Sequence, residues 1–309
     1  MNASDPGSPT DNHGRMMELS VVLVNFNDRP HLGECLSSIE NTSGCLHYEI
    51  IVVDNDSADG SQAYIARHFP KVKLIANNVN LGFARANNQG IRESRGEFIL
   101  FLNTDTAVQP GALGRLLEEL RSDPKAGAVG PALLRGSNSY QVSFGRRVSF
   151  FSELLQKLVL NPYYQFALKW SPKKRSVGWL SAACLLIRKA ALESAAGFDE
   201  DFFIYFEDID LCFRIRKAGW TLIYLPQARV LHEGGATTVS HLAAGRFEYR
   251  KSQLVFYNKH SSKASRFLLR LYLTLNFRLM AWRGKFRGES GQWLREQYSR
   301  LLEGRRKNA

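Results

Sequence analysis

Acidic and amide side chains stand where three apolar runs of the N-terminal half end. These side chains are Asn25, Asp54 and Asn103, with Asp105 two residues further on. A carboxylate such as Asp54 can accept a hydrogen bond from the N3–H of uracil or thymine, although capping of the following helix is the commoner role. A single carboxylate such as Asp105, with diphosphate oxygens and waters, is a usual way to hold Mg²⁺ or Mn²⁺, and Asn103 can add a neutral oxygen. The three strand ends together predict one ligand site.

A second acidic group lies in the segment FEDIDLCFR (206–214). It contains Glu207, Asp208 and Asp210, and Tyr205 precedes it. Acidic residues favour the first turn of a helix, so a purely structural role is one interpretation. The other is an acid or base in an acceptor pocket, because carboxyl groups beside aromatic side chains can bind a hydroxyl group and take its proton. These residues alone leave both interpretations open.

Two further segments carry weaker signals. Gly82 and Arg85 lie in NLGFARANNQG (80–90), where a glycine lets the backbone approach a ligand and an arginine suits a diphosphate. The segment lacks the GxGxxG pattern, and an ordinary junction between loop and helix explains it at least as well. His232 ends a short apolar run. A lone histidine is more often structural than a ligand, but its place after the second acidic group leaves a metal-binding role open.

An alternation of strands and helices must position these side chains. We expect strands over 19–25, 48–54, 72–77 and 97–103, and helices over 29–41, 84–94 and 206–219. Near-continuous apolar runs joined by helices predict right-handed crossovers and a mainly parallel sheet, which binds ligands at the carboxyl ends of its strands. Further segments are predicted as two short strands, 220–226 and 228–232, and as a variable region of loop and helix, 136–176.

The net charge of +12 is concentrated at the C-terminal end. Residues 1–245 hold 25 Lys or Arg against 25 Asp or Glu, whereas residues 246–309 hold 16 against 4. If 263–285 is one helix, five basic residues fall within an arc of roughly 120°, namely Lys263, Arg266, Arg270, Arg278 and Lys285. Such a helix suits an anionic membrane surface, and packing on the main body is an equal alternative. No recognisable module predicts nucleic acid as a partner.

The sequence shows neither a secretory signal nor a membrane-spanning run. Residues 1–17 are polar and predict a flexible lead, and the apolar stretch 267–282 is short and interrupted by Arg270 and Arg278. The four cysteines form no CxxC pair, which indicates a reduced chain. We therefore expect a cytoplasmic protein, either free or peripheral on the inner face of the cell membrane.

Taken in order, these motifs resemble the family 2 inverting glycosyltransferases of the GT-A fold. The resemblance covers about 19–232 and depends on LVNFN, VVDNDSADGS, NLGFARANNQGI, FLNTDT, GFDEDFFIYFEDIDLCFR and the final LH. The form with NTD and FEDIDLCFR is most similar to the bacterial rhamnosyltransferase and galactofuranosyltransferase branch. The resemblance implies an α/β, Rossmann-like nucleotide-diphospho-sugar transferase fold with a mainly parallel central sheet. The expected boundaries are 1–17 for the N-terminus, 18–238 for the catalytic domain and 239–309 for a basic helical extension.

The resemblance also implies roles for individual residues. Nucleotide binding would fall to Val24, Asn25, Asp54, Gly82, Arg85 and Asn103, with Asp54 contacting the base and Arg85 the diphosphate. Mg²⁺ or Mn²⁺ would be held by Asp105 and His232. Asp208 would be the catalytic base, supported on the acceptor side by Glu207, Tyr205 and Asp210. One departure is that the DxD motif of the family is Asn103-Thr104-Asp105 here, so its first carboxylate is missing.

The function expected from this resemblance is sugar transfer from a nucleoside-diphosphate donor in the synthesis of cell-surface polysaccharide. The acceptor would be a glycan or a sugar on a polyprenyl diphosphate, and dTDP-rhamnose is the first candidate donor, followed by UDP-galactofuranose or a UDP-hexose. A non-catalytic scaffold that binds nucleotide or glycan is the alternative from another class, against which the three aspartates argue. A nucleotidyltransferase would need a glycine-rich basic loop after the first strand, and LVNFNDRP has none.

Overall fold

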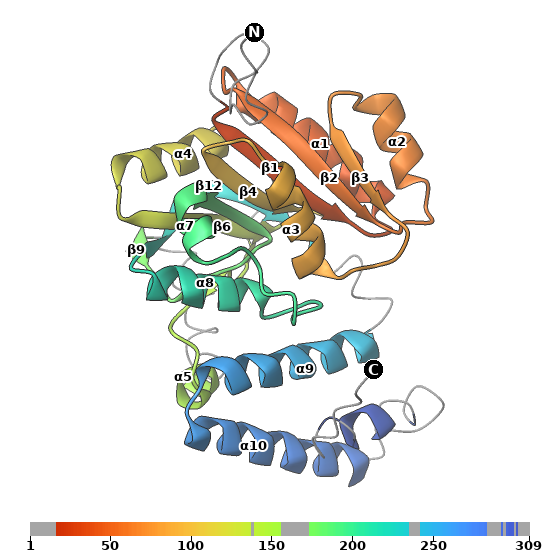
Figure 1. Cartoon of the computed structure of the whole chain (residues 1–309), viewed down its shortest axis with the longest axis vertical. Coiled ribbons are helices and arrows are strands. Elements are labelled where there is room, and N and C mark those ends of the chain that lie inside the picture. Colours follow the sequence, from red (N-terminus) through yellow and green to blue (C-terminus); the bar gives the residue numbers. More distant parts are fainter. Residues whose placement is uncertain are drawn as a thin grey trace, which may run out of the picture.

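The described part of the chain consists of a β-sheet with helices packed on it and a layer of long helices beneath (Figure 1). The computed structural model describes residues 17–136, 139–155, 173–234, 242–282, 292, 295–299 and 301. The strands are β1 (Leu19–Asn25), β2 (Tyr48–Asn55), β3 (Lys73–Asn77), β4 (Phe98–Asn103), β5 (Thr106–Val108), β6 (Ala126–Arg135), β7 (Ser139–Tyr140), β8 (Phe144–Gly145), β9 (Arg175–Ser176), β10 (Trp179–Leu180), β11 (Cys184–Arg188) and β12 (Thr221–His232). The helices are α1 (Arg29–Ser43), α2 (Ser61–His68), α3 (Phe83–Glu93), α4 (Ala112–Ser122), α5 (Phe150–Leu155), α7 (Lys189–Ser194), α8 (Glu207–Lys217), α9 (Leu242–His260) and α10 (Lys263–Trp282).

The main sheet has the strand order β3-β2-β1-β4-β11-β6-β12-β5. Only β11 and β5 run against the other strands on this path, so the sheet is mixed but mostly parallel. Strand β1 pairs in parallel with β2 and β4, which places Val24 between Val53 and Asn103. The carboxyl ends of β1, β2 and β4 therefore meet at one edge, as the alternation of strands and helices predicts.

Alternate side chains of the central strands enter two hydrophobic cores, one on each face of the sheet. From β1, Leu19, Val21 and Leu23 join the core with α1, α2 and α4, while Val22 joins the core with α3, α7 and α8. This period of two is the pattern of a strand covered on both faces. Burying each of these side chains contributes about 1.5–3 kcal/mol, and the two cores together hold the strand ends at fixed positions.

A third hydrophobic core joins α9 and α10 to the body. Phe202 and Phe206, from the loop that leads into α8, pack with Phe256 of α9 and with Leu269 and Leu273 of α10. The rings of Phe206 and Phe256 have centroids 5.7 Å apart. In Figure 1 these two helices lie below α8. The helical layer is therefore packed directly against the segment that carries the second acidic group.

A buried polar cluster ties α8 to α9 at the same place. Asp210 is fully buried; its Oδ2 accepts a hydrogen bond from Arg214 Nε at 2.7 Å, and its Oδ1 lies 2.6 Å from His260 Nε2. Ser252 of α9 also donates a hydrogen bond to the carbonyl oxygen of Ile204 at 2.8 Å. A buried carboxylate needs such partners because an unpaired charge away from water is costly. Asp210 thus connects the body to the helical layer.

The boundaries expected from the sequence differ from the structure mainly at the last strand. Two strands are expected over 220–232, but β12 is continuous, with a register shift between Leu225 and Arg229 where β6 remains its partner. A β-bulge accommodates Pro226 there without ending the strand. In the variable region, 156–172 lies outside the described residues, as do 1–16 and Lys285. Among the helices that the structure describes, we find none with the length and apolar character needed to cross a bilayer.

We predict that Asp210→Ala destabilises the protein strongly. The substitution leaves Arg214 and His260 without their buried carboxylate, and removal of one member of a buried pair costs about 3–5 kcal/mol. Urea denaturation would measure the loss in the free energy of unfolding. The control is Asp201→Ala, which removes a carboxylate that is 70% exposed and pairs with Lys259 at the surface; its expected cost is at most about 1 kcal/mol. Equal losses in the two variants would contradict the prediction.

Candidate functional site

A cavity of about 940 Å³ opens at the carboxyl ends of β1 and β4 and extends to α8 and α9. Eight residues singled out from the sequence line it, namely Val24, Gly82, Asn103, Asp105, Tyr205, Glu207, Asp208 and His232. Four others do not, namely Asn25, Asp54, Arg85 and Asp210. The cavity therefore brings together the polar strand ends and the second acidic group, which are about a hundred residues apart in the sequence.

Asp105 and His232 form a pair on one wall of the cavity. The antiparallel pairing of β5 with β12 sets Thr106 opposite His232, so the preceding Asp105 lies beside the imidazole, with its Oδ1 3.4 Å from His232 Nε2. Gln141 fixes the ring, because its Nε2 donates to the His232 carbonyl oxygen at 2.5 Å and its Oε1 lies 2.8 Å from Nδ1. With the Nδ1 proton directed at Gln141, a neutral His232 presents the lone pair of Nε2 toward Asp105.

This pair fits a divalent cation that takes its remaining ligands from elsewhere. A carboxylate oxygen and an imidazole nitrogen on one wall are suitable donors, and Gly234 N–H holds the second oxygen of Asp105 at 3.2 Å. Within the described part of the chain, three or more His, Cys, Asp or Glu side chains do not gather at any one point as a complete metal site would require. Two protein ligands leave room for diphosphate oxygens and waters, the usual supplement for Mg²⁺.

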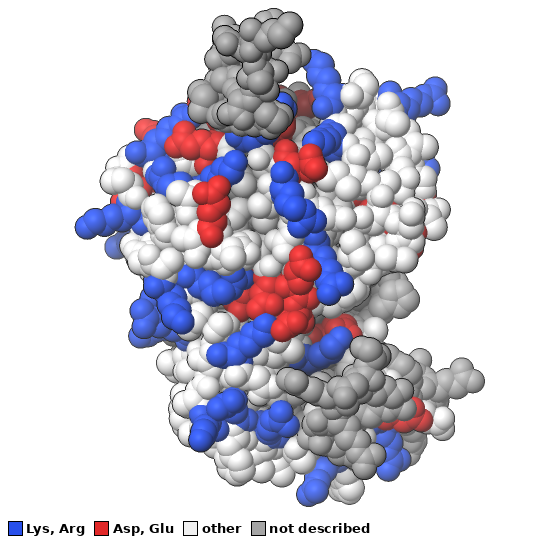
Figure 2. Space-filling view, in the orientation of Figure 1, with Lys and Arg blue, Asp and Glu red and all other residues white. Residues whose placement is uncertain are grey.

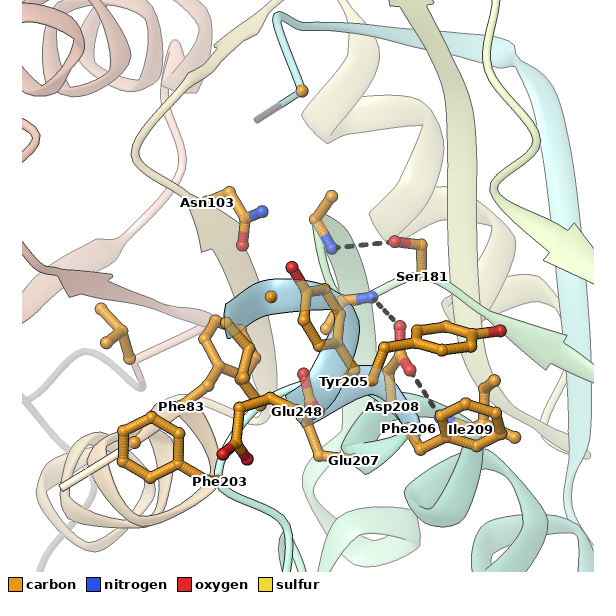
Figure 3. Close-up of a pocket in the computed structure, with 18 of the residues that line it drawn as sticks. Phe83, Asn103, Ser181, Phe203, Tyr205, Phe206, Glu207, Asp208, Ile209 and Glu248 are labelled. Atoms are coloured by element: carbon orange, nitrogen blue, oxygen red, sulfur yellow. Dashed lines mark hydrogen bonds between the residues drawn. The ribbon is translucent and has the colours of Figure 1, made fainter. Parts of the chain in front are cut away.

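Asp208 faces the cavity from the first turn of α8 (Figure 3). Its Oδ2 accepts a hydrogen bond from Ala182 N–H at 3.1 Å, and its Oδ1 accepts one from Ile209 N–H at 2.7 Å. Burial raises the pKa of Asp208, and these two backbone donors oppose the rise by stabilising the carboxylate. A carboxylate that is held in place and has an elevated pKa is well suited to accept a proton.

Among the carboxyl groups that line the cavity, Glu207 is the least exposed. It is only 6% exposed, and its Oε2 lacks a hydrogen-bond partner among the described residues. Burial raises its pKa well above 4.5, and the neighbouring charge of Asp208 raises it further. A proton on Glu207 therefore avoids a second negative charge beside the carboxylate of Asp208.

A strained turn leads into α8 and directs its aromatic residues. Tyr205 and Phe206 have φ angles of 68° and 67°, the left-handed region that non-glycine residues rarely occupy. Such a conformation costs of order 1–3 kcal/mol per residue. The turn is held by the packing of Phe206 against Tyr249 and Phe256 of α9, with ring centroids 5.2 and 5.7 Å apart. It places Tyr205 on the cavity wall while Phe206 fills the core beneath.

Asp54 and Asn25 lie behind the cavity wall. Both are fully buried, and Asn25 Nδ2 donates a hydrogen bond to Asp54 Oδ1 at 2.8 Å. Asp54 Oδ2 accepts two more bonds, from Ser57 N–H at 3.0 Å and Gln62 Nε2 at 2.9 Å. These donors hold the loop after β2, and Asn55, the last residue of β2, lines the cavity. In this conformation Asp54 positions that loop, and contact between its carboxylate and a base stays a prediction.

Gly82 and Arg85, which are close in the sequence, lie in different surroundings. Gly82 lines the cavity with a φ of 82°, and a Cβ atom there would lie 2.6 Å from Phe203. Phe83 N–H also donates to the Phe203 carbonyl oxygen at 2.7 Å, so this loop packs against the segment before α8. Arg85 is 55% exposed and pairs with Glu200 at 3.3 Å. Contact between Arg85 and a diphosphate would require Arg85 to leave Glu200.

Helix α9 contributes cavity residues that the sequence analysis does not identify. Gly245, Glu248 and Tyr249 line the cavity, and Figure 3 shows Glu248 beside Phe203 and Glu207. The only indication of Glu248 in the sequence is its charge, because it is one of four acidic residues among the sixteen basic ones of 246–309. Its place in the site depends on the packing of α9 against the body, and neither motif nor strand order indicates that packing.

Comparisons with known proteins place this geometry in context. The model of the family described as glycosyl transferase family 2 matches residues 20–195. The chain is 32% identical to an N-acetylglucosaminyl-diphospho-decaprenol L-rhamnosyltransferase of Mycobacterium tuberculosis, over 93% of this chain and 98% of the relative. It is 26% identical to the rhamnosyltransferase WbbL of Escherichia coli, over 69% of this chain and 82% of that protein.

Solved structures are similar in fold. A mannosyltransferase of Pyrobaculum calidifontis, solved in complex with GDP-Man and Mn²⁺, superposes with a TM-score of 0.57 at 17% sequence identity. The superposition covers 93% of this chain and 74% of the other. At this level of identity the likeness shows the arrangement of strands and helices, and the chemistry must be argued from the side chains of this chain.

We predict that Glu207→Gln weakens the pH dependence of stability. Because the pKa of Glu207 is raised in the folded state, the folded protein binds more protons than the unfolded chain above pH 4.5, and its stability falls as the pH rises through this range. Glutamine removes that proton-binding group, so the fall should become shallower by up to about 1.4 kcal/mol per pH unit. Urea denaturation at several pH values between 5 and 8 would measure how the free energy of unfolding changes with pH.

The matched control is Glu193→Gln, which removes an exposed glutamate of α7. We expect its stability to follow the same pH profile as that of the wild-type protein. A Glu207→Gln profile that is indistinguishable from the wild type would mean that Glu207 is ionised in the folded protein.

Proposed function

Because the chain belongs to glycosyltransferase family 2 and has the GT-A fold, we propose that it transfers L-rhamnose from a nucleoside diphosphate to a sugar carried on a polyprenyl diphosphate. The activity as a glycosyltransferase follows from the family. The sugar and acceptor are supported by the rhamnosyltransferase of Mycobacterium tuberculosis, because the match extends over nearly the whole of both chains. The second rhamnosyltransferase supports the same sugar over the UDP-sugar donors.

The observation that carries this proposal is the position of Asp208 in the same cavity as Asp105 and His232. The donor would lie at the strand ends, with its nucleotide near Val24 and Asn55 and its diphosphate toward Asp105. dTDP is the nucleotide that we propose. When Mg²⁺ or Mn²⁺ is bound by Asp105 and His232, it neutralises charge on the diphosphate. These groups bind and orient the donor, and they leave its anomeric carbon facing α8.

The proposed reaction is a single displacement with inversion at the anomeric carbon. The acceptor hydroxyl oxygen forms a bond to that carbon as the bond to the diphosphate oxygen breaks, and Asp208 takes the hydroxyl proton. The raised pKa of Asp208 improves it as a base, and Ala182 and Ile209 hold its carboxylate in one orientation. The diphosphate leaves as an anion, and the proton stays on Asp208 until it passes to water.

A scaffold that binds nucleotide without catalysis would not need this arrangement. It would have no use for a carboxylate such as Asp208, which is half-buried, has a raised pKa and is aimed into a cavity. Glu207, next to it, is a buried carboxyl group whose pKa is also raised. Two poorly solvated carboxyl groups on one helical turn destabilise the folded protein. A role in proton transfer explains why both are present, and simple binding of nucleotide does not.

We predict that Asp208→Asn reduces rhamnosyl transfer by about 10²–10⁴-fold, because the amide keeps the shape of the side chain but cannot act as the base. Release of dTDP from dTDP-rhamnose in the presence of a lipid-linked acceptor measures transfer. Affinity for dTDP, measured by calorimetry, should stay unchanged, because Asp208 lies on the acceptor side of the cavity. Asp201→Asn, at an exposed position, is the control. Retained turnover in Asp208→Asn would remove this residue from the role of base.

We also propose that α10 holds the enzyme on an anionic membrane. An outer stripe of apolar side chains projects from this helix, consisting of Phe267, Leu271, Leu275, Leu279 and Trp282. Their exposed fractions reach 66% for Phe267 and 82% for Trp282, while Leu269 and Leu273 on the inner face are buried. Figure 2 shows basic side chains beside uncharged surface over this helical layer. An exposed apolar stripe with flanking basic residues is typical of a helix that lies in the membrane interface.

We predict that the double substitution Phe267→Ser with Leu275→Ser weakens binding to vesicles of phosphatidylcholine and phosphatidylglycerol by at least about tenfold, because two large apolar side chains lose their burial in lipid. Co-flotation with the vesicles measures the bound fraction. The control is Val79→Ser, which removes an apolar side chain that is 59% exposed in the loop after β3. Equal binding by the double variant and the wild type would contradict the membrane role of α10.

A further inference from the structure

A second cavity, of about 420 Å³, lies between α9 and α10. Helix α10 contributes Leu273, Asn276, Phe277 and Met280, whose spacing of three and four residues puts them on one face of the helix. Tyr298, from the C-terminal part of the chain, stacks on Phe277 with ring centroids 5.8 Å apart. The wall from α10 is therefore mainly apolar, as expected for a site that accepts a hydrocarbon chain.

The wall from α9 is cationic. Arg246 and Arg250 line the cavity one turn apart, and the residues described along its wall include no aspartate or glutamate. Among the described residues, neither arginine forms an ion pair. Arg250 is oriented by a hydrogen bond from its Nη1 to Gln253 at 2.7 Å and by the rings of Tyr249 and Tyr272, at 5.5 and 5.8 Å from its guanidinium. Two arginines that form no ion pair with the carboxylates in the described part of the chain suit a diphosphate.

The second cavity adjoins the first. Tyr205, Gly245 and Tyr249 line both, and the rings of the two tyrosines meet edge to face with centroids 5.8 Å apart. Gly245 of α9, the third residue that both cavities share, has no side chain to obstruct the passage from one cavity to the other. A ligand whose anionic group contacts Arg246 and Arg250 can therefore direct one end past these tyrosines toward Asp208 and the other along the apolar face of α10.

The far side of α10 faces outward. At 100° per residue, the four residues that line the second cavity lie on the face opposite to the outer stripe of Phe267, Leu271, Leu275, Leu279 and Trp282. One helix thus separates the proposed membrane surface from an apolar cavity. A lipid-linked substrate has to leave the bilayer to reach a cavity of this kind, and α10 offers apolar surface on both faces along that route.

We propose that the second cavity is the binding site for the prenyl diphosphate part of the acceptor, with Arg246 and Arg250 binding the diphosphate and α10 contacting the isoprenoid chain. This inference rests on the proposed function and names the part of the protein that selects the lipid carrier. The sugar of the acceptor then passes alongside Tyr205 and Tyr249, next to Gly245, and presents its hydroxyl group to Asp208. Arg246 and Arg250 are binding residues, and they take no part in the proton transfer.

The test measures binding of farnesyl diphosphate to the full chain by calorimetry, in the presence of saturating dTDP so that the donor site is filled. We expect Arg246→Ala to raise the dissociation constant at least about tenfold, because a charge-assisted hydrogen bond to the diphosphate is lost. Arg246→Lys should recover part of the affinity. The matched control is Arg278→Ala, which removes an exposed arginine from the outward face of α10 and should change the constant less than about twofold.

A second variant tests the apolar wall. Met280→Trp places a larger side chain in the cavity and should weaken the binding of farnesyl diphosphate at least about tenfold. Isopentenyl diphosphate, which has a single isoprene unit, should bind weakly to both the wild-type protein and this variant. Each variant must bind dTDP as the wild type does, which shows that it is folded. Unchanged affinity for farnesyl diphosphate in both Arg246→Ala and Met280→Trp would overturn the proposal, as would its displacement by dTDP.

The same measurements separate this inference from the proposed function. If the wild-type chain binds dTDP and transfers sugar but does not bind farnesyl diphosphate, the second cavity is not the lipid site and the proposed chemistry stands. If it binds neither compound, both proposals fail.

Discussion

The arrangement of the site depends on how the first turn of α8 accommodates three carboxyl groups with little water. Helical periodicity directs them to different neighbours: Asp210 to Arg214 and His260, Asp208 to two backbone N–H groups, and Glu207 to the cavity wall. The cost of burial is met differently in each case: by ion pairing for Asp210, by hydrogen bonding for Asp208, and for Glu207 by a raised pKa, which favours the protonated form. The contact between Asp210 and His260 holds the end of α9 against α8, and Glu248 and Tyr249 of α9 line the same cavity as the other two carboxyl groups.

Much of the sheet could be predicted because its signals are local. Apolar runs ending in polar residues locate β1, β2 and β4 almost to the residue, and parallel order then requires their ends to meet. The juxtaposition of Asp105 with His232 follows from one more fact, the pairing of β5 with β12. This pairing could not be predicted from the sequence, because Asp105 and His232 are far apart in the chain and β5 is only three residues long.

Other features of the site depend on burial and long-range packing. Asp54 and Asp105 both follow apolar runs, yet only Asp105 reaches the cavity, because three donors around Asp54 hold its oxygens in the loop after β2. Asp210 and Asp208 differ by two positions, and the partner that separates their roles, His260, is fifty residues away. The contribution of α9 to the cavity was likewise beyond prediction, since its sequence carries no motif and its place in the site depends on long-range packing against the body.

Helix α9 falls within 239–309, the extension expected from the sequence, but its residues line the first cavity and pack against α8. Glu248 and Tyr249 line the same space as Asp208, and His260 is bound to Asp210. Recombination that exchanged residues 239–309 between related enzymes would therefore disturb the proposed catalytic centre as well as the surface. We therefore expect the sheet domain and residues 239–309 to evolve together. A change in the proposed lipid specificity should then need coordinated substitutions in both parts, rather than exchange of residues 239–309 as an independent module.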